Sequence, residues 1–364
     1  MRIYLESLLN EFAIQRPNYQ FILFTPTWTD SLCETLPANV QIVKLSGVPI
    51  SRPLRIIYQQ TAFIAAIAHQ RLDVLFATAT VAPLLVKVPV VLAVQFLQFY
   101  KMPEAYGWFR TAYLRLMLPL SLKKAVRAII FTEHSKHDLV RYTRVSPDKV
   151  SVIPHGLSKD TWSLAKATDD APYRQIGLSL TGDRPYIVYV SSTYGYKNHI
   201  RLIRAFALFK LQTKLPHVLL LIGSEVSVSF DRLKTVAREC NVLKDVVIAG
   251  RLDHHQALAT YLCADLAVIP TLYETFGYPV LEAMAIGCPV VTSKGGSMAE
   301  LAGDAAVLVD PLDEKSIAYG IECALNDQSL RQSLIVRGRQ RAEEYTWERN
   351  AARVLEILEE AGRV

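Results

Sequence analysis

Residues 273–287 of this chain, YETFGYPVLEAMAIG, decide how it folds. Short apolar runs of the buried-strand type lie on either side, at residues 265–270 and 288–292, so the segment is predicted to be a loop and a helix that join two parallel strands. Pro279 suits the first helical position, where no amide partner is lost, and Gly287 suits the left-handed residue just past a helix end. The pattern predicts an α/β domain built on a parallel sheet.

The loop before this helix is predicted to present free backbone amides, around residues 276–278, at the carboxyl edge of the sheet. An anion would bind there. Glu274 lies in the loop and Glu282 one turn inside the helix, so both carboxylates can face one ligand. With a phosphate on the amides, Glu282 could accept two hydrogen bonds from a ribose diol, and Glu274 would lie beside a sugar on the far phosphate. The alternative is that Glu282 complements the helix dipole and Glu274 caps the helix.

This segment resembles the signature of retaining nucleotide-sugar glycosyltransferases of the GT-B fold, the group 1 family, also called glycosyltransferase family 4. That family carries two glutamates separated by seven residues, as Glu274 and Glu282 are. The match continues through Gly295, Gly296 and Glu300. Thr275 stands where the family usually has glycine. The resemblance implies that Glu274 holds the donor sugar and that Glu282 holds the ribose.

The resemblance also implies the other site residues. Lys197 matches a lysine that binds the donor diphosphate, and we predict that it is catalytic together with Glu274; the alternative is a solvated lysine in a helix cap. Ser191 or Ser192 replaces an arginine that assists this lysine in the family. Gln95 stands on the acceptor side, where the family often has a histidine. The predicted donor-binding residues are Glu282, Thr275, Phe276, Gly277, Tyr278, Gly250, Arg251 and Leu252.

Composition predicts a globular protein, and the resemblance implies that it has no resident metal or cofactor. The chain has 364 residues, of which 51% are hydrophobic and 20% charged, which argues against disorder and for two domains. Its five cysteines are scattered and odd in number, which favours a reducing compartment with neither a disulfide framework nor a zinc site. They are Cys33, Cys240, Cys263, Cys288 and Cys323. The spacing of His134, His137 and His155 is not that of a helical metal-ligand pair.

The charge is concentrated in the first part of the chain. Residues 1–158 hold 17 Lys and Arg against 9 Asp and Glu, a net charge of +8, whereas the remainder carries −2. This excess favours an anionic surface, either acidic lipid headgroups or nucleic acid, and we favour the membrane because no nucleic-acid motif is present. Aromatic and basic residues interleave in a helical region, 106–126, that is predicted to break at Pro119. This composition suits an interfacial contact, but the charges do not share one face, so we favour a solvated surface. No signal peptide is recognised, so we expect a cytoplasmic protein, peripheral at the inner membrane face.

The predicted fold is two Rossmann-like domains that face each other across a cleft. Residues 1–158 would form the acceptor-side domain, completed by a C-terminal helix at 348–364, and residues 159–347 the nucleotide-sugar-binding domain. A polar linker is predicted at 158–170. The family's first strand and Gly-rich turn, which precede the helix at 4–15, are not found. We therefore expect a gap between the strands at 20–24 and 73–77, or a chain that begins further upstream.

The predicted function is transfer of a hexose from a nucleoside-diphosphate sugar to a hydroxyl, with retention and without a metal ion. The acceptor would be a glycan or a lipid-linked molecule of cell-surface polysaccharide or glycolipid synthesis, and no nucleic-acid partner is expected. Two alternatives remain open. One is a non-catalytic relative that only binds nucleotide-sugar, and the other is a phosphorylase or sugar-phosphate synthase of the same fold.

Overall fold

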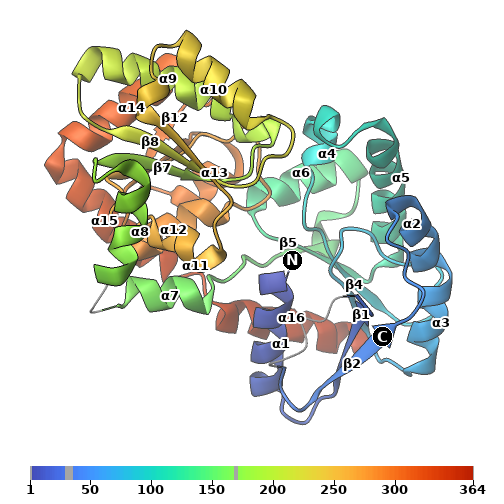
Figure 1. Ribbon diagram of the computed structural model, residues 1–364. Helices are drawn as coiled ribbons and strands as arrows, with labels where there is room; N and C mark the ends of the chain where they lie inside the picture. The colour runs from blue at the N-terminus through green and yellow to red at the C-terminus, as the bar shows by residue number, and fades with distance from the viewer. Residues whose placement is uncertain (1, 29–35, 168–170, 364) are drawn as a thin grey trace. The chain divides into compact units, whose positions relative to one another are not determined.

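The computed structural model describes residues 2–28, 36–167 and 171–363 (Figure 1). The chain divides into two compact units. Unit 1 comprises Met1–Tyr100, Trp108–Ser158 and Thr346–Val364, and unit 2 comprises Lys101–Gly107 and Lys159–Tyr345. The sequence-based division at residue 158 placed 101–107 in the first domain. This segment belongs to unit 2, where the Lys101 ammonium lies 4.5 Å from the centre of the Tyr273 ring.

Unit 2 is built on a six-stranded sheet in which every neighbouring pair of strands is parallel. Its strands lie in the order β12-β11-β10-β7-β8-β9. Their bounds are β7 Tyr186–Val190, β8 Val218–Ile222, β9 Val246–Gly250, β10 Leu266–Ile269, β11 Val290–Ser293 and β12 Val307–Val309. The strand order reverses between β7 and β10, which are direct neighbours. In sheets of this type the crevice at the carboxyl ends of those two strands is the usual ligand site.

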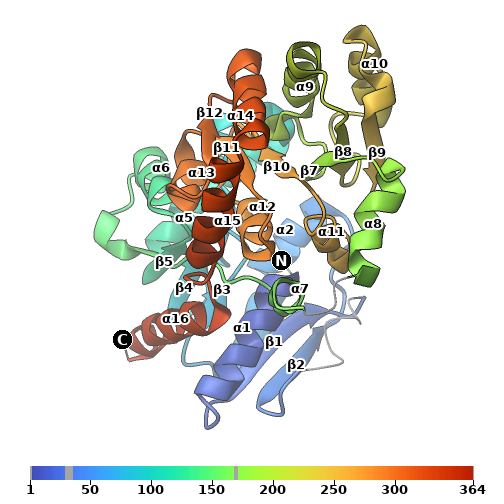
Figure 2. The ribbon, with the colours of Figure 1, turned by 90° about the vertical axis from the view of Figure 1, so that its left-hand side faces the viewer.

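The helices of unit 2 pack on this sheet. Their bounds are α7 Lys159–Ala165, α8 Ala171–Thr181, α9 His199–Thr213, α10 Phe230–Glu239, α11 His254–Ala259, α12 Tyr278–Ile286, α13 Gly296–Ala302, α14 Glu314–Asn326 and α15 Gln328–Ala342. Helix α12 is apolar on nearly all sides, and it lies against α15, α7 and the sheet (Figure 2). A helix of that composition is stable only when it is buried.

The predicted polar linker at 158–170 is wrong in part, because residues 159–165 form helix α7. Thr161 and Leu164 of α7 are buried, and the helix contacts α11 and α12. The polar side chains of α7 therefore lie on its exposed side, whereas Thr161 and Leu164, one turn apart, pack the other side against unit 2.

The described residues of unit 1 form two separate parallel sheets. The first pairs β1 Phe21–Pro26 with β2 Val40–Leu45, and the second has the order β3-β4-β5-β6, with β3 Leu75–Ala77, β4 Val90–Ala93, β5 Arg127–Ile130 and β6 Val150–Val152. Its helices are α1 Arg2–Gln15, α2 Arg52–Gln60, α3 Ala62–His69, α4 Gln98–Lys101, α5 Trp108–Lys124, α6 Glu133–Thr143 and α16 Trp347–Gly362.

The C-terminal helix α16 packs beside α1 (Figures 1 and 2). The Gln15 side-chain amide donates to the Glu348 carbonyl oxygen at 3.0 Å, and Arg16 forms an ion pair with Glu359 at 2.6 Å. The last helix of the chain is thereby part of the same unit as the first.

Helix α5 runs through Pro119 without interruption, so the predicted break there is wrong. Proline removes one helical hydrogen bond and usually costs about 3 kcal/mol in a helix interior. Leu118 and Leu122 are almost completely buried beside it. The Ser121 hydroxyl donates to the Met117 carbonyl oxygen at 2.7 Å and accepts from the Ala82 amide at 3.1 Å. Burial on both sides of Pro119 holds the helix together.

Residues 52–69 form two helices, α2 and α3, which meet at Thr61. Thr61 has φ −132° and ψ −92°, outside the helical region. Its hydroxyl donates to the Ile57 carbonyl oxygen at 2.8 Å and so occupies an acceptor of the last turn of α2. The break occupies a single residue and does not interrupt the apolar pattern, so it could not be predicted from the sequence.

Candidate functional site

The loop after β10 and the start of α12 are fixed by two glycines and a proline, as the sequence predicts. Pro279 lies in the first turn of α12, and Gly287 ends the helix with φ 87°. Gly277 precedes the helix with φ 145°, and a Cβ atom there would collide with the side chain of Met298. Thr275 and Phe276 are buried. The first amides of α12 therefore lie at the carboxyl edge of the sheet, where β7 and β10 are neighbours.

Lys197 and Glu274 form an ion pair at this edge. Their side chains are only 15% and 13% exposed. Lys197 ends a short 3₁₀ turn that follows β7, whereas Glu274 lies in the loop that follows β10. The structure thus brings together the two residues that the sequence predicts to be catalytic, although 77 positions separate them.

Backbone hydrogen bonds hold the two loops against each other. The carbonyl oxygen of Tyr196 accepts from the Leu272 amide at 2.8 Å and from the Thr271 hydroxyl at 3.1 Å. The Tyr189 hydroxyl, which comes from inside β7, donates to the Lys197 carbonyl oxygen at 3.0 Å. Because the backbone on both sides of Lys197 is fixed, its ammonium group is positioned before any ligand binds.

Asn198 is a residue of this site that the sequence analysis missed. It has φ 66°, in the left-handed region that asparagine tolerates better than most residues. Its side-chain amide donates to the carbonyl oxygens of Pro270 at 2.9 Å and Pro311 at 2.7 Å, and its oxygen accepts from Arg201 at 2.7 Å. Asn198 thereby ties the loops after β7, β10 and β12 together. An asparagine directly before a helix was the signal that could have revealed it.

Glu282 lies in α12 with its side chain partly buried. Burial raises the pKa of its carboxyl group from 4.5 to about 7, and the nearby charge of Lys197 opposes this increase. The charge of Glu282 in turn contributes to the raised pKa of the buried Tyr261. Glu274, Glu282 and Lys197 therefore form one electrostatic cluster at the switch point of the sheet. A glutamate whose pKa is shifted toward neutrality is common at functional sites.

His199 lies beneath the cluster and stays neutral. Burial lowers the pKa of its imidazole to about 4, and its Nε2 lies 3.2 Å from the carbonyl oxygen of Ser191. The ring lies beside Tyr189. Ser191, one of the two serines at the place of the family's arginine, is thus held through its backbone rather than through a charged side chain.

The predicted donor-binding residues 250–252 lie at the same sheet edge, where β9 ends. Gly250 has φ 73°, and its carbonyl oxygen accepts from the Gly223 amide at 2.8 Å. A Cβ atom on Gly223 would collide with the backbone of Ser191. This close approach brings the chain after β9 beside the chains after β8 and β7. Arg251 is exposed and Leu252 is partly buried.

Gln95 belongs to unit 1, so the structure does not group it with the cluster around Glu274. It follows β4, and its backbone amide donates to the Thr80 hydroxyl at 3.0 Å. Its side chain lies near the buried hydroxyl of Tyr4, and the Tyr4 ring contacts His155. Burial lowers the pKa of His155 well below its usual value.

Several wider properties of the described residues bear on function. Among the described residues, no three or more His, Cys, Asp or Glu side chains are placed together so that they could hold a metal ion. Cys240, Cys263, Cys288 and Cys323 carry free thiols, and Cys33 lies outside the part of the chain that the structure describes. No helix formed by those residues combines the length and hydropathy needed to cross a membrane.

Comparison with known proteins identifies relatives of both units. The family model "Glycosyltransferase Family 4" matches residues 3–161, and "Glycosyl transferases group 1" matches residues 176–341. The O-antigen chain mannosyltransferase B of Escherichia coli is 27% identical over 255 residues, which are 69% of this chain and 65% of that protein. This chain therefore spans slightly less than two thirds of the length of that relative.

Solved structures show the same fold. Sucrose-phosphate synthase from Thermosynechococcus elongatus superposes with a TM-score of 0.78 at 22% identity, over 98% of this chain and 92% of that chain. Anabaena HepE, in complex with UDP and glucose, superposes with a TM-score of 0.74 at 19% identity, over 98% of this chain and 95% of that chain. The two α/β units with parallel sheets are those of the GT-B glycosyltransferases. Within that class, the chain belongs to glycosyltransferase family 4, whose two models together match most of its length.

Proposed function

We propose that this protein is a retaining glycosyltransferase that moves a hexose from a nucleoside-diphosphate sugar to a hydroxyl group of a glycan or lipid-linked acceptor. The observation that carries the proposal is the ion pair of Lys197 with Glu274 beside the partly buried Glu282. The cluster combines a fixed cation, two carboxylates and a helix N-terminus at one sheet edge, which is a suitable environment for a diphosphate joined to two sugars.

The donor is assigned to unit 2. Lys197 and the amides of Phe276 to Tyr278 would bind the diphosphate, and the Glu282 carboxylate would accept hydrogen bonds from the ribose diol. The backbone of residues 250–252 would contact the base. A nucleotide-sugar donor agrees with the structure of Anabaena HepE, which is a complex with UDP and glucose.

The same groups account for the chemistry. As the bond between the sugar anomeric carbon and the diphosphate oxygen breaks, negative charge grows on the diphosphate, where Lys197 and the α12 amides would stabilise it. Glu274 would hold the sugar. The leaving phosphate would take the acceptor hydroxyl's proton, and the acceptor oxygen would bond to the anomeric carbon on that same face, which retains the configuration. Lys197 supplies positive charge at the position that needs it, so we propose that transfer requires no metal ion.

Product analysis tests this proposal. After incubation with nucleoside-diphosphate hexoses and hydroxyl acceptors, we expect a glycoside with the donor's anomeric configuration by proton NMR, formed at an unchanged rate in EDTA. Loss of activity in EDTA with recovery in manganese, or an inverted product, would contradict the mechanism. Sugar phosphate formed only with inorganic phosphate would instead identify a phosphorylase.

Two variants separate the assigned roles. Glu282→Ala should mainly weaken nucleotide binding, because its carboxylate contacts the ribose in the ground state, whereas Glu274→Ala should mainly lower kcat. Glu239→Ala is a matched control, since Glu239 is an exposed glutamate of the same unit, 3.4 Å from Arg232. Equal losses of affinity and rate in both site variants would refute the separate roles.

We also propose that unit 1, to which Gln95 and the acceptor are assigned, binds an anionic membrane surface at the cytoplasmic side. Helix α5 exposes large apolar side chains, with Trp108 82%, Phe109 55% and Leu116 64% exposed. Lys123 and Lys124 end the same helix. Exposed aromatic and aliphatic residues beside basic ones are typical of interfacial helices.

Vesicle sedimentation tests the membrane proposal. The wild-type protein should bind vesicles that contain acidic lipid and not neutral ones, and Trp108→Ser with Phe109→Ser should abolish binding. The control is Leu211→Ser with Tyr319→Ser, which removes two exposed apolar residues from unit 2, 77% and 67% exposed. Equal binding by both double variants would overturn the proposed surface.

A further inference from the structure

A third segment lies beside the two loops that carry the ion pair of Lys197 and Glu274. Residues 101–107 belong to unit 2. The Lys101 ammonium lies over the ring of Tyr273, the residue before Glu274, and Tyr273 is only 5% exposed. Burial raises the pKa of Tyr196, the residue before Lys197, and the charges of Glu274 and Tyr106 add to the increase. The two ends of the segment are therefore close to the two halves of the ion pair.

Hydrogen bonds of its own backbone hold this segment in a compact turn. Residues 103–105 form a short 3₁₀ helix. The Ala105 amide donates to the Met102 carbonyl oxygen at 3.1 Å, and the Tyr106 amide donates to the Pro103 carbonyl oxygen at 3.1 Å. The chain directly after Lys101 thus has a defined conformation, which limits where the Lys101 side chain can reach.

The residues of the ion-pair cluster do not supply enough positive charge for a diphosphate. Glu274 matches the charge of Lys197, and Glu282 adds a second carboxylate. Ser191 and Ser192 stand at the place of the family's arginine. Each phosphate of a nucleoside-diphosphate sugar is ionised at neutral pH, and like charges at close range repel each other. A further cation at this edge would offset that repulsion.

Three other cations of unit 2 are less well placed to do so. Arg201 donates to the Asn198 side-chain oxygen at 2.7 Å, and Lys294 forms an ion pair with Asp310 at 2.9 Å. Arg251 follows β9, which is two strands away from β7 in the sheet.

Lys101 has both the position and the chemistry that a phosphate needs. Its side chain is exposed, and its ammonium group lies 4.5 Å from the centre of the Tyr273 ring. An ammonium group on the face of an aromatic ring stays charged and has further N–H donors for a ligand. Because Glu274 is assigned to the donor sugar, a cation beside it faces the phosphate that bears this sugar.

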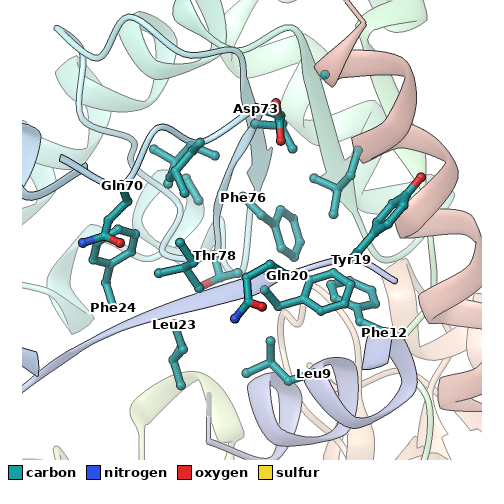
Figure 3. Close-up of a pocket in the computed structure, with 18 of the residues that line it drawn as sticks. Leu9, Phe12, Tyr19, Gln20, Leu23, Phe24, Gln70, Asp73, Phe76 and Thr78 are labelled. Carbon is teal, nitrogen blue, oxygen red and sulfur yellow. The ribbon is translucent and has the colours of Figure 1, made fainter. Parts of the chain in front are cut away.

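A cavity of about 830 Å³ in unit 1 is separate from this site (Figure 3). Leu9, Phe12, Leu23 and Phe76 are among its lining residues, all of which belong to unit 1. Its walls are mainly apolar, and burying a charged phosphate against apolar walls is costly. The cavity is therefore not an alternative site for the diphosphate.

We propose that Lys101 is a further residue of the donor site and binds the phosphate to which the sugar is attached. This inference rests on the proposed function, in which that phosphate is the leaving group. The Lys101 ammonium donates hydrogen bonds to its oxygens and, together with Lys197, stabilises the negative charge that grows as the bond to the anomeric carbon breaks. Lys101 gives up no proton and forms no covalent bond.

Isothermal titration calorimetry of the full chain with UDP, GDP and ADP, and with UMP, GMP and AMP, tests the proposal. Lys101→Met removes the charge and keeps a side chain of similar length. It should weaken binding of the nucleoside diphosphate that the wild type binds by about tenfold or more, and binding of the monophosphate by less than about threefold, because a monophosphate lacks the second phosphate.

Two further variants are controls for this measurement. Lys101→Arg keeps the charge and should retain most of the affinity. Lys234→Met removes a lysine of α10 that is 54% exposed and lies 3.8 Å from Asp231, and it should leave the affinity unchanged. This control separates a local contact from a change in the net charge of unit 2.

The outcomes distinguish this inference from the proposed function. Unchanged affinity of Lys101→Met for the nucleoside diphosphate would overturn the role of Lys101 and leave the proposed function standing. Equal weakening for monophosphate and diphosphate would also overturn it, because it would show loss of the folded segment rather than of a phosphate contact. A wild type that binds no nucleoside diphosphate would overturn the proposed function, and this inference with it.

Discussion

Replacing Glu282 by glutamine should stabilise the protein at alkaline pH while weakening its site. Burial raises the pKa of this carboxyl group from 4.5 to about 7, so the folded state holds the proton more tightly than the unfolded chain does. The stability of the wild type should therefore fall as the pH rises from about 4.5 to about 7. Glutamine keeps the shape of the side chain and removes the charge.

The size of the effect follows from the shift in pKa. Each pKa unit corresponds to about 1.4 kcal/mol, so the full shift would cost the wild type about 3 kcal/mol above pH 7. The side chain is only partly buried and solvent screens part of this cost, so we expect about 2 kcal/mol. The advantage of Glu282→Gln should be absent near pH 4 and complete near pH 8.

Urea denaturation of both proteins across this pH range measures the difference directly, since the titration of all other groups cancels in the comparison. The pH dependence of nucleotide affinity in the wild type should be opposite to that of its stability. The wild type should bind more tightly as the pH rises through about 7, and the variant should bind weakly throughout, because a neutral amide is a poorer acceptor for the ribose diol. A stability difference that does not vary with pH would refute this reasoning.

Two further substitutions test the architecture of the site. Gly277→Ala should destabilise the protein by about 2 to 4 kcal/mol in the same urea assay, because φ is 145° and the new Cβ would collide with Met298. The control is Gly295→Ala, whose new Cβ would have nothing within 4 Å and should change stability by less than about 0.5 kcal/mol. Asn198→Ala should cost about 2 to 4 kcal/mol, because the Pro270 carbonyl oxygen loses its side-chain donor and the Pro311 carbonyl oxygen keeps only the long bond from Arg201 at 3.4 Å. The loss should be clearly larger than that of Asn241→Ala, which changes an exposed left-handed asparagine; equal losses would show that only backbone conformation matters.

The sequence predicted the centre of the site well, because its signals there are local. Pro279 and Gly287 mark the two ends of α12 through backbone conformations that few other residues adopt, and the structure confirms both. Glu274 and Glu282 are close in sequence, so their proximity follows from one loop and one helical turn. That Lys197 belongs to the same site could be predicted only from the family resemblance, because its contact with Glu274 depends on β7 and β10 being neighbours in the sheet.

Other features of the fold could not be predicted because they depend on tertiary packing. The continuity of α5 through Pro119 depends on the burial of Leu118 and Leu122, and neither residue differs in type from many that are exposed. The role of Asn198 depends on carbonyl groups more than 70 positions away. The membership of residues 101–107 in unit 2 has no local signal at all.

We propose that the cluster of Lys197, Glu274 and Glu282 binds a nucleoside-diphosphate sugar. The most direct measurement is a thermal-shift panel of nucleoside diphosphates and their hexose conjugates, on the wild type and on Glu282→Ala. At about 100 times its dissociation constant a ligand stabilises the folded state by about 2.7 kcal/mol, so at least one nucleotide should raise the Tm of the wild type. We expect this shift to be lost in Glu282→Ala and kept in Glu239→Ala. A panel without any shift, or a shift that Glu282→Ala retains in full, would contradict the proposal.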